Sequence, residues 1–200
     1  MAGESADAMA RRLRERTTRL DRSAAMWERG AAGGPATANA LKAMDDAWMV
    51  LHDVRWPGRP FANIDHIAVG PGGVFVITSQ SWSGPVWLTG EVLRHNGRPR
   101  GREVLSTREA AAAVARRLTY VPPTWVTPVL CILGSNVSGW VGKVAVCHKG
   151  NITDLLTSRT PVLSPEVVRA VAEDLRSQLA SPLPPAPRRR SAWLWRPRSH

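Results

Sequence analysis

The 200-residue sequence lacks an apolar run long enough to cross a membrane, which would need about 20 consecutive apolar residues. Its best apolar run, residues 126–133, is short and is interrupted by Pro128. The N-terminus is rich in alanine and arginine and lacks the apolar centre of a secretory signal. We therefore expect a cytoplasmic protein.

Cysteine is also scarce. The two cysteines, Cys131 and Cys147, are too few for a disulfide framework in a chain of this length. Both lie in apolar, strand-like runs, so buried free thiols are expected. A zinc site would need more ligands at close spacing, and only His148 is adjacent.

Acidic residues are absent from the C-terminal stretch 188–198, which carries five arginines. The whole chain has a net charge of +11, which suits a polyanion such as nucleic acid or an anionic membrane surface. The stretch combines cations with exposed aromatic rings, a pattern that suits base stacking and, equally, a membrane interface. The candidate nucleic-acid-binding residues here are Arg188, Arg189, Arg190, Trp193, Trp195, Arg196 and Arg198.

Three segments are expected along the chain. Residues 1–29 form an arginine-rich helix with one narrow apolar stripe that includes Leu13, Leu20 and Trp27. This stripe can pack on the domain or mediate self-association as a short coiled coil. Residues 30–180 form the folded domain. Residues 181–200, rich in proline, arginine and tryptophan, are expected to be disordered.

Within the domain, a helix should begin at Pro35 and end near Asp46, because proline is tolerated in the first helical turn. Strands are expected at 48–54, 63–70 and 74–79. The sequence Pro71-Gly72-Gly73 predicts a tight turn that joins the second and third strands as an antiparallel hairpin.

The rest of the domain adds further strands and helices. A capping box at Ser106–Glu109 predicts a helix over 110–118, and Ser164 with Pro165 predicts the start of the last helix. Trp48, Trp87 and Trp125 are expected in the core. The other elements expected are a strand within 86–94, strands at 126–133 and 143–147, and a short helix at 151–157. This order predicts an α/β fold in which helices flank one mixed β-sheet.

The hairpin carries the candidate site. Asp65 is a lone carboxylate in an otherwise apolar strand, and the following strand ends with the polar residues Thr78, Ser79 and Gln80. Side chains alternate between the faces of a strand, so Thr78 and Gln80 share a face. The hairpin should bring that face near Asp65.

This segment resembles the NERD (nuclease-related) domain, a branch of the restriction-endonuclease-like PD-(D/E)XK superfamily. The residues that carry the resemblance are Ile64-Asp65-His66, the run 69–77, and Trp82-Ser83-Gly84. It is strong over residues 30–94 and looser toward the last helix. The resemblance implies a restriction-endonuclease-like core and metal-dependent hydrolysis of phosphodiesters.

The superfamily's chemistry uses two carboxylates that bind a divalent ion, a lysine that orients the attacking water, and often a glutamate on the first helix. Position by position, Asp65 is retained, whereas Thr78 stands for the second carboxylate, Gln80 for the lysine and Gly34 for the glutamate. Asp65 alone would be a weak metal ligand, so no cofactor is expected, and Mg²⁺ or Mn²⁺ only if activity persists. The leading hypothesis is a degenerate nuclease that acts as a nucleic-acid-binding or regulatory module.

Two alternatives stay open. The protein is an active divalent-metal-dependent nuclease if the missing groups have moved, to carboxylates among Asp53, Glu91, Glu103 and Glu109 and to Lys42 or Lys143 as the base. It is instead a membrane-peripheral or protein-interaction scaffold if the N-terminal helix and the Trp/Arg-rich tail are its working parts.

Overall fold

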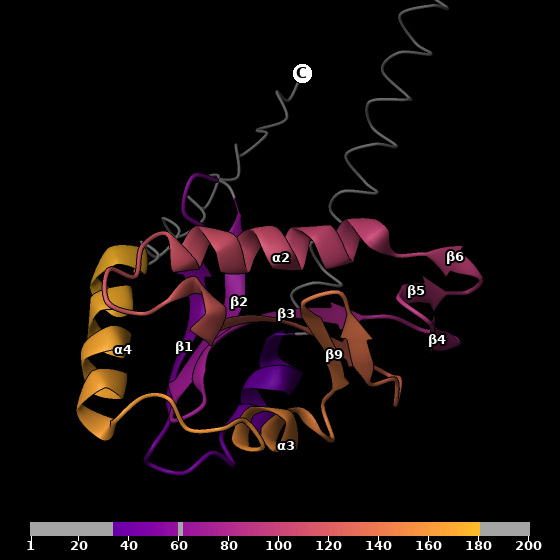
Figure 1. Cartoon of the computed structure of the whole chain (residues 1–200). Helices are drawn as coiled ribbons and strands as arrows, with labels where there is room; N and C mark the ends of the chain where they lie inside the picture. The colour runs from indigo at the N-terminus through magenta and orange to yellow at the C-terminus, as the bar shows by residue number, and fades with distance from the viewer. Residues whose placement is uncertain (1–33, 60–61, 181–200) are drawn as a thin grey trace, which may run out of the picture.

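The computed structural model describes residues 34–59 and 62–180 (Figure 1). The expected N-terminal helix and the expected C-terminal tail lie outside these residues. The central sheet has six strands in the order β1-β2-β3-β7-β9-β8. The first three strands, β1 (Met49–Arg55), β2 (Asn63–Gly70) and β3 (Gly73–Ser81), pair antiparallel to one another. Strands β7 (Val126–Leu133) and β9 (Val144–His148) follow and run parallel to β3. Strand β8 (Gly139–Val141) forms the edge of the sheet and pairs antiparallel with β9. The predicted mixed sheet is confirmed.

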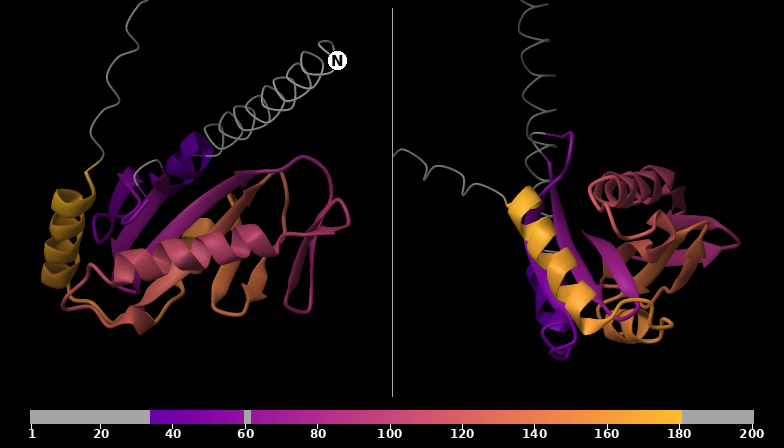
Figure 2. Two further views of the ribbon diagram at one scale, coloured as in Figure 1. Left: turned by 90° about the horizontal axis from the view of Figure 1, so that it is seen from above. Right: turned by 60° about the vertical axis from the view of Figure 1, so that its left-hand side comes forward.

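Helices cover both faces of this sheet (Figures 1 and 2). On one face, α2 (Gly101–Ala115) and α4 (Pro165–Leu179) pack on Val74 and Val76 of β3 and on neighbouring residues of β1 and β2. On the other face, residues 34–41 and α3 (Ile152–Thr157) pack on Phe75 and Ile77. Because side chains alternate along β3, one strand supplies both cores. Such two-sided burial requires the continuous apolar run found between residues 74 and 77.

A small three-stranded sheet lies beside the main one, with β4 (Val86–Thr89), β5 (Val92–His95) and β6 (Arg98–Pro99) in order. Leu93 of β5 is buried with Leu130 and Ile132 of β7. Trp82, just after β3, stacks on His95 with ring centroids 5.1 Å apart, and the guanidinium carbon of Arg100 lies 5.2 Å from its ring centroid. These contacts hold the small sheet against the end of β3. A single 3-10 turn, η1 (Pro123–Trp125), precedes β7.

Several sequence predictions are confirmed in detail. The bounds predicted for β2 and β7 agree with the structure, and Pro71 and Gly72 form the two-residue turn of the β2–β3 hairpin. Cys131 and Cys147 are buried free thiols. Trp48 is in the core. No helix in the described part of the chain has the length and hydropathy needed to span a membrane.

The predicted start of the middle helix was wrong. Helix α2 begins at Gly101, and the hydroxyl of Thr107 donates to the carbonyl of Glu103 within the helix. The capping-box pattern therefore lies inside a helix, where threonine satisfies its hydroxyl by bonding back one turn. The helix also ends at Ala115 rather than at residue 118.

Other boundaries also differ. The single strand expected within 86–94 is two strands that turn at Gly90 and Glu91, and β8 was not predicted. Trp87 is 38% exposed, so its assignment to the core was wrong; it lies on the outer face of the small sheet, which the pattern of one strand does not reveal. The first described helix already includes Gly34 and ends at residue 41, where a turn follows, rather than near Asp46.

Candidate functional site

The candidate site lies where β2 and β3 separate. Their paired residues run from Gly70 and Gly73 at the turn to His66 and Ile77, and the pairing stops there. At the next position, Oδ2 of Asp65 accepts a hydrogen bond of 2.6 Å from the backbone N–H of Ser79. The Asp65 carboxylate thus accepts from the Ser79 N–H in place of a backbone carbonyl of β2, at the point where β2 and β3 stop pairing. The hairpin places Asp65 beside residues 78–80, as the sequence predicted.

The side chains around this bond point to two faces of the sheet. The Ser79 hydroxyl donates to Oγ1 of Thr37 at 2.9 Å, and Thr37 in turn contacts Sγ of Cys131 at 3.7 Å. Ser79 therefore faces the helix at 34–41. Thr78 and Gln80 point to the opposite face, the one covered by α2. Both are half-buried, and neither side chain makes a hydrogen bond to a described residue.

Gly34, the position of the helix glutamate in the superfamily, does not join Thr78 and Gln80. It belongs to the helical segment that faces Ser79, and its backbone lies near the ring of His66. A Cβ built on Gly34 would meet nothing within 4 Å, so space is not the reason for glycine here. We have no structural account of this residue.

A second carboxylate lies opposite Asp65 on the neighbouring strand. The pairs His52–His66 and Val54–Ile64 flank Asp53 and Asp65, which are themselves not paired. Asp53 has φ of 50°, in the left-handed region that non-glycine residues seldom occupy. Its Oδ1 accepts a 2.7 Å hydrogen bond from the Asn63 amide. A local irregularity of β1 therefore turns an acid toward the site.

Burial dominates the ionisation of Asp65. Burial, opposed by the Ser79 N–H and reinforced by the charge of Asp53, raises the pKa of this carboxyl to about 6. A bound cation or a neighbouring lysine would lower this pKa instead. Among the described residues, the side chains beside Asp65 at positions 78 and 80 are the neutral Thr78 and Gln80, so no lysine does so from these two positions.

Two histidines lie beside the acids. The Nδ1 atoms of His52 and His66 are 2.8 Å apart, so one ring donates to the other. Burial and, less strongly, the neighbouring His52 lower the pKa of His66 to about 4, against the opposing effects of the Gly34 backbone and the charge of Asp53. Nε2 of His66 has no hydrogen-bond partner of good geometry in the described chain. His66 is thus a buried neutral residue.

The other candidates for displaced catalytic groups are scattered. Glu109 pairs with Arg59, and Glu103 pairs with Arg100 at 3.3 Å. Glu91 and Lys143 line a hollow beside α2, at a distance from the β2–β3 divergence along the sheet. Lys42 is exposed in the turn after residue 41 and acts electrostatically on His52. Asp53 is the one displaced candidate that the fold brings to Asp65.

These residues do not fit a divalent metal centre of the usual kind. Mg²⁺ prefers several hard oxygen ligands, often including one or two carboxylates. Residues 34–59 and 62–180 contain no group of three His, Cys, Asp or Glu that could hold a metal ion. One Asp65 oxygen is already bound by the Ser79 N–H, and Asp53 is bound by Asn63. One oxygen of each acid is therefore engaged by a neutral donor of the protein itself.

One family of known proteins matches this chain. A family model described as the nuclease-related domain, NERD, matches residues 29–133. The chain belongs to the NERD family. The match extends to the end of β7, so it includes the hairpin, Asp65 and the positions of Thr78 and Gln80. Searches of curated proteins and of solved structures gave no match.

Proposed function

We propose that this NERD protein has lost metal-dependent phosphodiester hydrolysis and serves as a cytoplasmic nucleic-acid-binding or regulatory module. One observation carries the proposal: the groups beside Asp65 are the neutral Thr78 and Gln80, and Asp65 is held by the Ser79 N–H with its pKa raised to about 6. A NERD-type nuclease needs a second carboxylate and a lysine at these two positions.

Loss of those charges has a large energetic consequence. Removing one preorganised group that stabilises the transition state typically costs about 3 kcal/mol, or a factor of a hundred or more in rate. Two such losses are not additive in general, but together they leave catalysis near background. The fold survives such losses because residues 78 and 80 are only half-buried.

The first prediction concerns cleavage. The full chain, incubated with supercoiled plasmid or single-stranded DNA and Mg²⁺ or Mn²⁺, is expected to cleave neither, and Asp65→Ala is expected to give the same result. Agarose and denaturing gels over several hours provide the measurement. Cleavage by the wild type that is abolished in Asp65→Ala would overturn the proposal.

Binding is tested separately. The net charge of +11 supports association with a polyanion. Each phosphate contact should contribute about 0.9 to the slope of log affinity against log salt on duplex DNA, and about 0.7 on single strands. Fluorescence anisotropy at increasing salt concentration gives this slope, and an affinity independent of salt would contradict nucleic-acid binding.

The active-nuclease alternative has one observation in its favour, the position of Asp53 opposite Asp65. In that case Asp53 replaces the carboxylate missing at Thr78. The cleavage assay therefore includes Asp53→Ala: metal-dependent cleavage that is lost in both the Asp53 and Asp65 variants would establish a rebuilt site. Asp46→Ala, an exposed carboxylate outside the sheet, is the matched control.

A further inference from the structure

A groove separate from the Asp65 site runs between α2, the start of β7 and the β8–β9 turn. Its main hollow has a volume of about 610 Å³. A second hollow of about 400 Å³ shares Arg108 and Lys143 with it, and a third of about 340 Å³ shares Thr127 and Arg159. We call these three adjoining hollows together the Trp140 groove. Ligand pockets typically measure about 300–1,000 Å³, so the main hollow can hold one nucleotide.

The sheet explains why the groove exists. Val126, Thr127 and Pro128 pair with β3 on one side, but β9 pairs with β7 only from Val129 onward. The first residues of β7 thus have an open edge. Above it, α2 presents the small side chains of Ala111, Ala112 and Ala115, which leave space, and the longer side chain of Arg108 lines the same hollow.

The groove is distinct from the Asp65 site. Thr127 lies beside Phe75 in the β3–β7 ladder, whereas Ser79 lies beside Cys131. Four residues of strand separate the two positions, which corresponds to about 13 Å. The groove also has its own charge: the main hollow is lined by three cations, Arg108, Lys143 and Arg159, and by no carboxylate.

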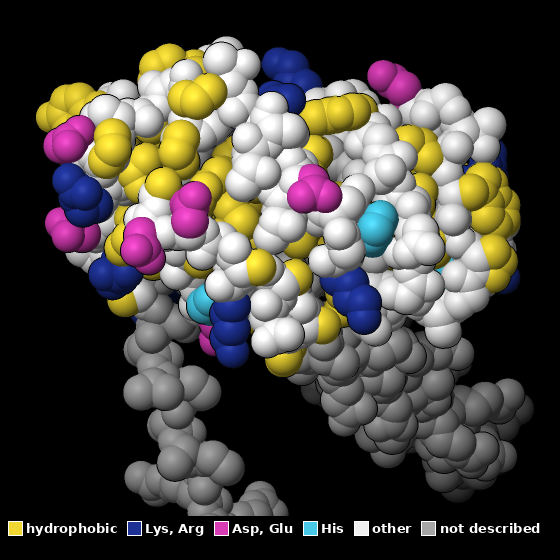
Figure 3. Space-filling view, turned by 90° about the horizontal axis from the view of Figure 1, so that it is seen from below, with side chains coloured by type: hydrophobic (Ala, Val, Ile, Leu, Met, Phe, Trp, Pro, Cys, Tyr) yellow, Lys and Arg dark blue, Asp and Glu magenta, His cyan; other side chains and the backbone are white. Residues whose placement is uncertain are grey.

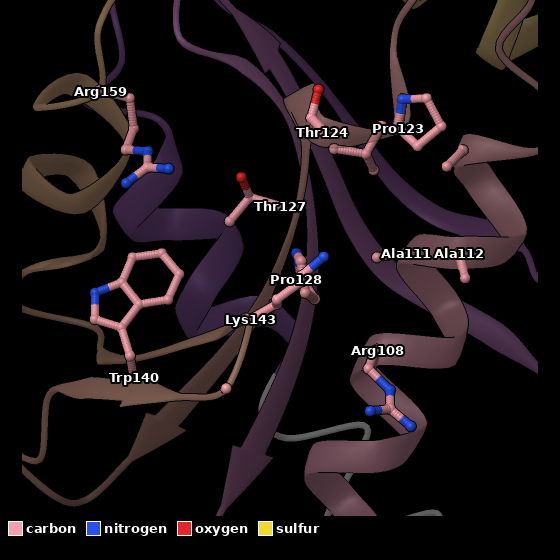
Figure 4. A pocket seen from close by; sticks show the side chains of 13 residues that line it. Arg108, Ala111, Ala112, Pro123, Thr124, Thr127, Pro128, Trp140, Lys143 and Arg159 are labelled. Carbon is pink, nitrogen blue, oxygen red and sulfur yellow. The ribbon is translucent and has the colours of Figure 1, made fainter. Parts of the chain in front are cut away.

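These cations are available to a ligand. The ion pairs among the described residues are Arg59–Glu109, Arg100–Glu103 and Arg169–Glu166, and none uses a cation of the groove. Figure 4 shows Arg159 and Trp140 on one side of the hollow and Arg108 on the other, with Lys143 between them. The face of the molecule shown in Figure 3 has a different distribution of charge from the main hollow of the groove, because acidic and basic side chains are mixed on it.

Trp140 adds an aromatic surface beside the cations. Its side chain is on the edge strand β8 and is 40% exposed, which is unusual for so large an apolar group. The guanidinium carbon of Arg159 lies 5.3 Å from its ring centroid. The hydroxyls of Thr124 and Thr127 line the same hollow and make no hydrogen bond to a described residue.

We infer that the Trp140 groove binds a nucleotide, with the base stacked on Trp140 and the phosphate held by Lys143, Arg159 and Arg108. Stacking on an aromatic ring combined with phosphate neutralisation is how proteins hold single-stranded nucleic acid without reading its sequence. The nucleotide is either free or part of a single strand, and the elongated groove favours a strand. In the latter case the inference rests on the proposed function and assigns its binding site.

The two ends of the groove differ in charge because Glu91 lines only one of them. Glu91 lines the 400 Å³ hollow, whereas the opposite 340 Å³ hollow contains Arg159 and three residues with hydroxyl side chains besides Thr127 and no acid. The phosphate is therefore expected toward Arg159 and Thr124. Reversing the charge at Arg159 should accordingly have a larger effect than reversing it at Arg108.

The test uses the full chain with three probes: a fluorescein-labelled single strand of deoxyadenylates by anisotropy, and AMP and inorganic phosphate by titration calorimetry. Trp140→Ala is expected to weaken binding of the single strand about tenfold through loss of stacking. Lys143→Glu and Arg159→Glu are each expected to weaken it about tenfold or more and to lower the salt slope by about 0.7 per lost phosphate contact. Arg176→Glu, on the exposed side of α4, is the matched control and should leave the affinity essentially unchanged.

The outcomes separate this inference from the proposed function. If the single strand binds but the groove variants behave like Arg176→Glu, the groove is not the site, while nucleic-acid binding stands. If AMP binds in a groove-dependent manner and the single strand does not bind, the groove holds a free nucleotide and the proposed function fails. Binding of inorganic phosphate as tight as that of AMP, or no binding of either AMP or the single strand, would overturn the inference. Thermal melting of each variant shows that the comparison is made on folded protein.

Discussion

Replacing Asp65 by asparagine is expected to stabilise the folded chain by about 2–3 kcal/mol at neutral pH and to leave its stability unchanged below the ordinary pKa of an aspartate. The pKa of Asp65 rises from 3.8 in the unfolded chain to about 6 in the folded one. Each pKa unit corresponds to about 1.4 kcal/mol. Because the folded pKa is raised, the folded state is favoured when the acid is protonated, and that stability is lost as the pH rises from about 4 through 6.

Asparagine imitates the protonated acid. It keeps an oxygen that can accept the Ser79 N–H, and it carries no charge to desolvate. Urea denaturation of both proteins across the acidic to neutral pH range provides the measurement, and Asp46→Asn is the control for removal of an exposed carboxylate. If Asp65→Asn destabilises the protein at neutral pH, the ionised carboxylate is stabilised in the native state, which would contradict the degenerate site.

Protonation of His66 changes the stability of the fold in the opposite direction to protonation of Asp65, over nearly the same pH range. The folded pKa of His66, about 4, is lower than the ordinary value of 6.5, so stability is lost as the pH falls from 6.5 toward 4. In the wild type this loss partly cancels the gain from protonation of Asp65. The Asp65→Asn variant should therefore show a steeper rise of stability between pH 4 and 6.5 than the wild type does.

A carboxylate that weakens the fold at neutral pH is typical of a functional site. In an active nuclease, cationic partners would offset the cost of burying the charge. Here the position of the lysine carries the neutral Gln80, so this cationic partner is missing beside Asp65. The same measurement therefore bears on the proposed function: addition of millimolar Mg²⁺ should not change the stability of the wild type relative to Asp65→Asn.

The sequence predicted the hairpin and its contents because the signals there are local. The run from Asn63 to Gly70, the turn at Pro71 and Gly72, and the apolar run that follows specify their own pairing. Since the hairpin register follows from the turn, the proximity of Asp65 to residues 78–80 was also predictable. The resemblance to the NERD domain rests on these same residues.

Other parts of the site depend on contacts between distant segments. Asp53 was one of several displaced candidates, and only the β1–β2 register together with its positive φ places it opposite Asp65. The Trp140 groove combines residues from α2, the β8–β9 turn and the loop after α3, and no motif connects them. Similarly, Ser106 has the residues of a helix cap, but the chain is already helical from Gly101 because tertiary packing extends the helix.

Replacing Gly70 by alanine is expected to destabilise the protein by about 3 kcal/mol or more, although the change adds only one methyl group. A Cβ at this position would lie 2.3 Å from two ring atoms of Trp48. Trp48 is buried and packs on Phe75 with ring centroids 5.7 Å apart, so it cannot move aside without disturbing the core. Overpacking typically costs about 1–3 kcal/mol, and a clash with a buried ring lies at the upper end or beyond.

Differential scanning calorimetry should show a fall in Tm of about 10 °C, given that 1 kcal/mol corresponds to about 2–4 °C for a domain of this size. Gly101→Ala is the matched control, because a Cβ there meets nothing within 4 Å and the residue begins α2. It should leave Tm unchanged or raise it slightly. Combining Gly70→Ala with Trp48→Leu should cost clearly less than the sum of the two single changes, since removal of the ring relieves the clash. A Gly70→Ala protein that melts at the wild-type temperature would show that the ring does not occupy this position, and with it the packing of β2 against Trp48 would be wrong.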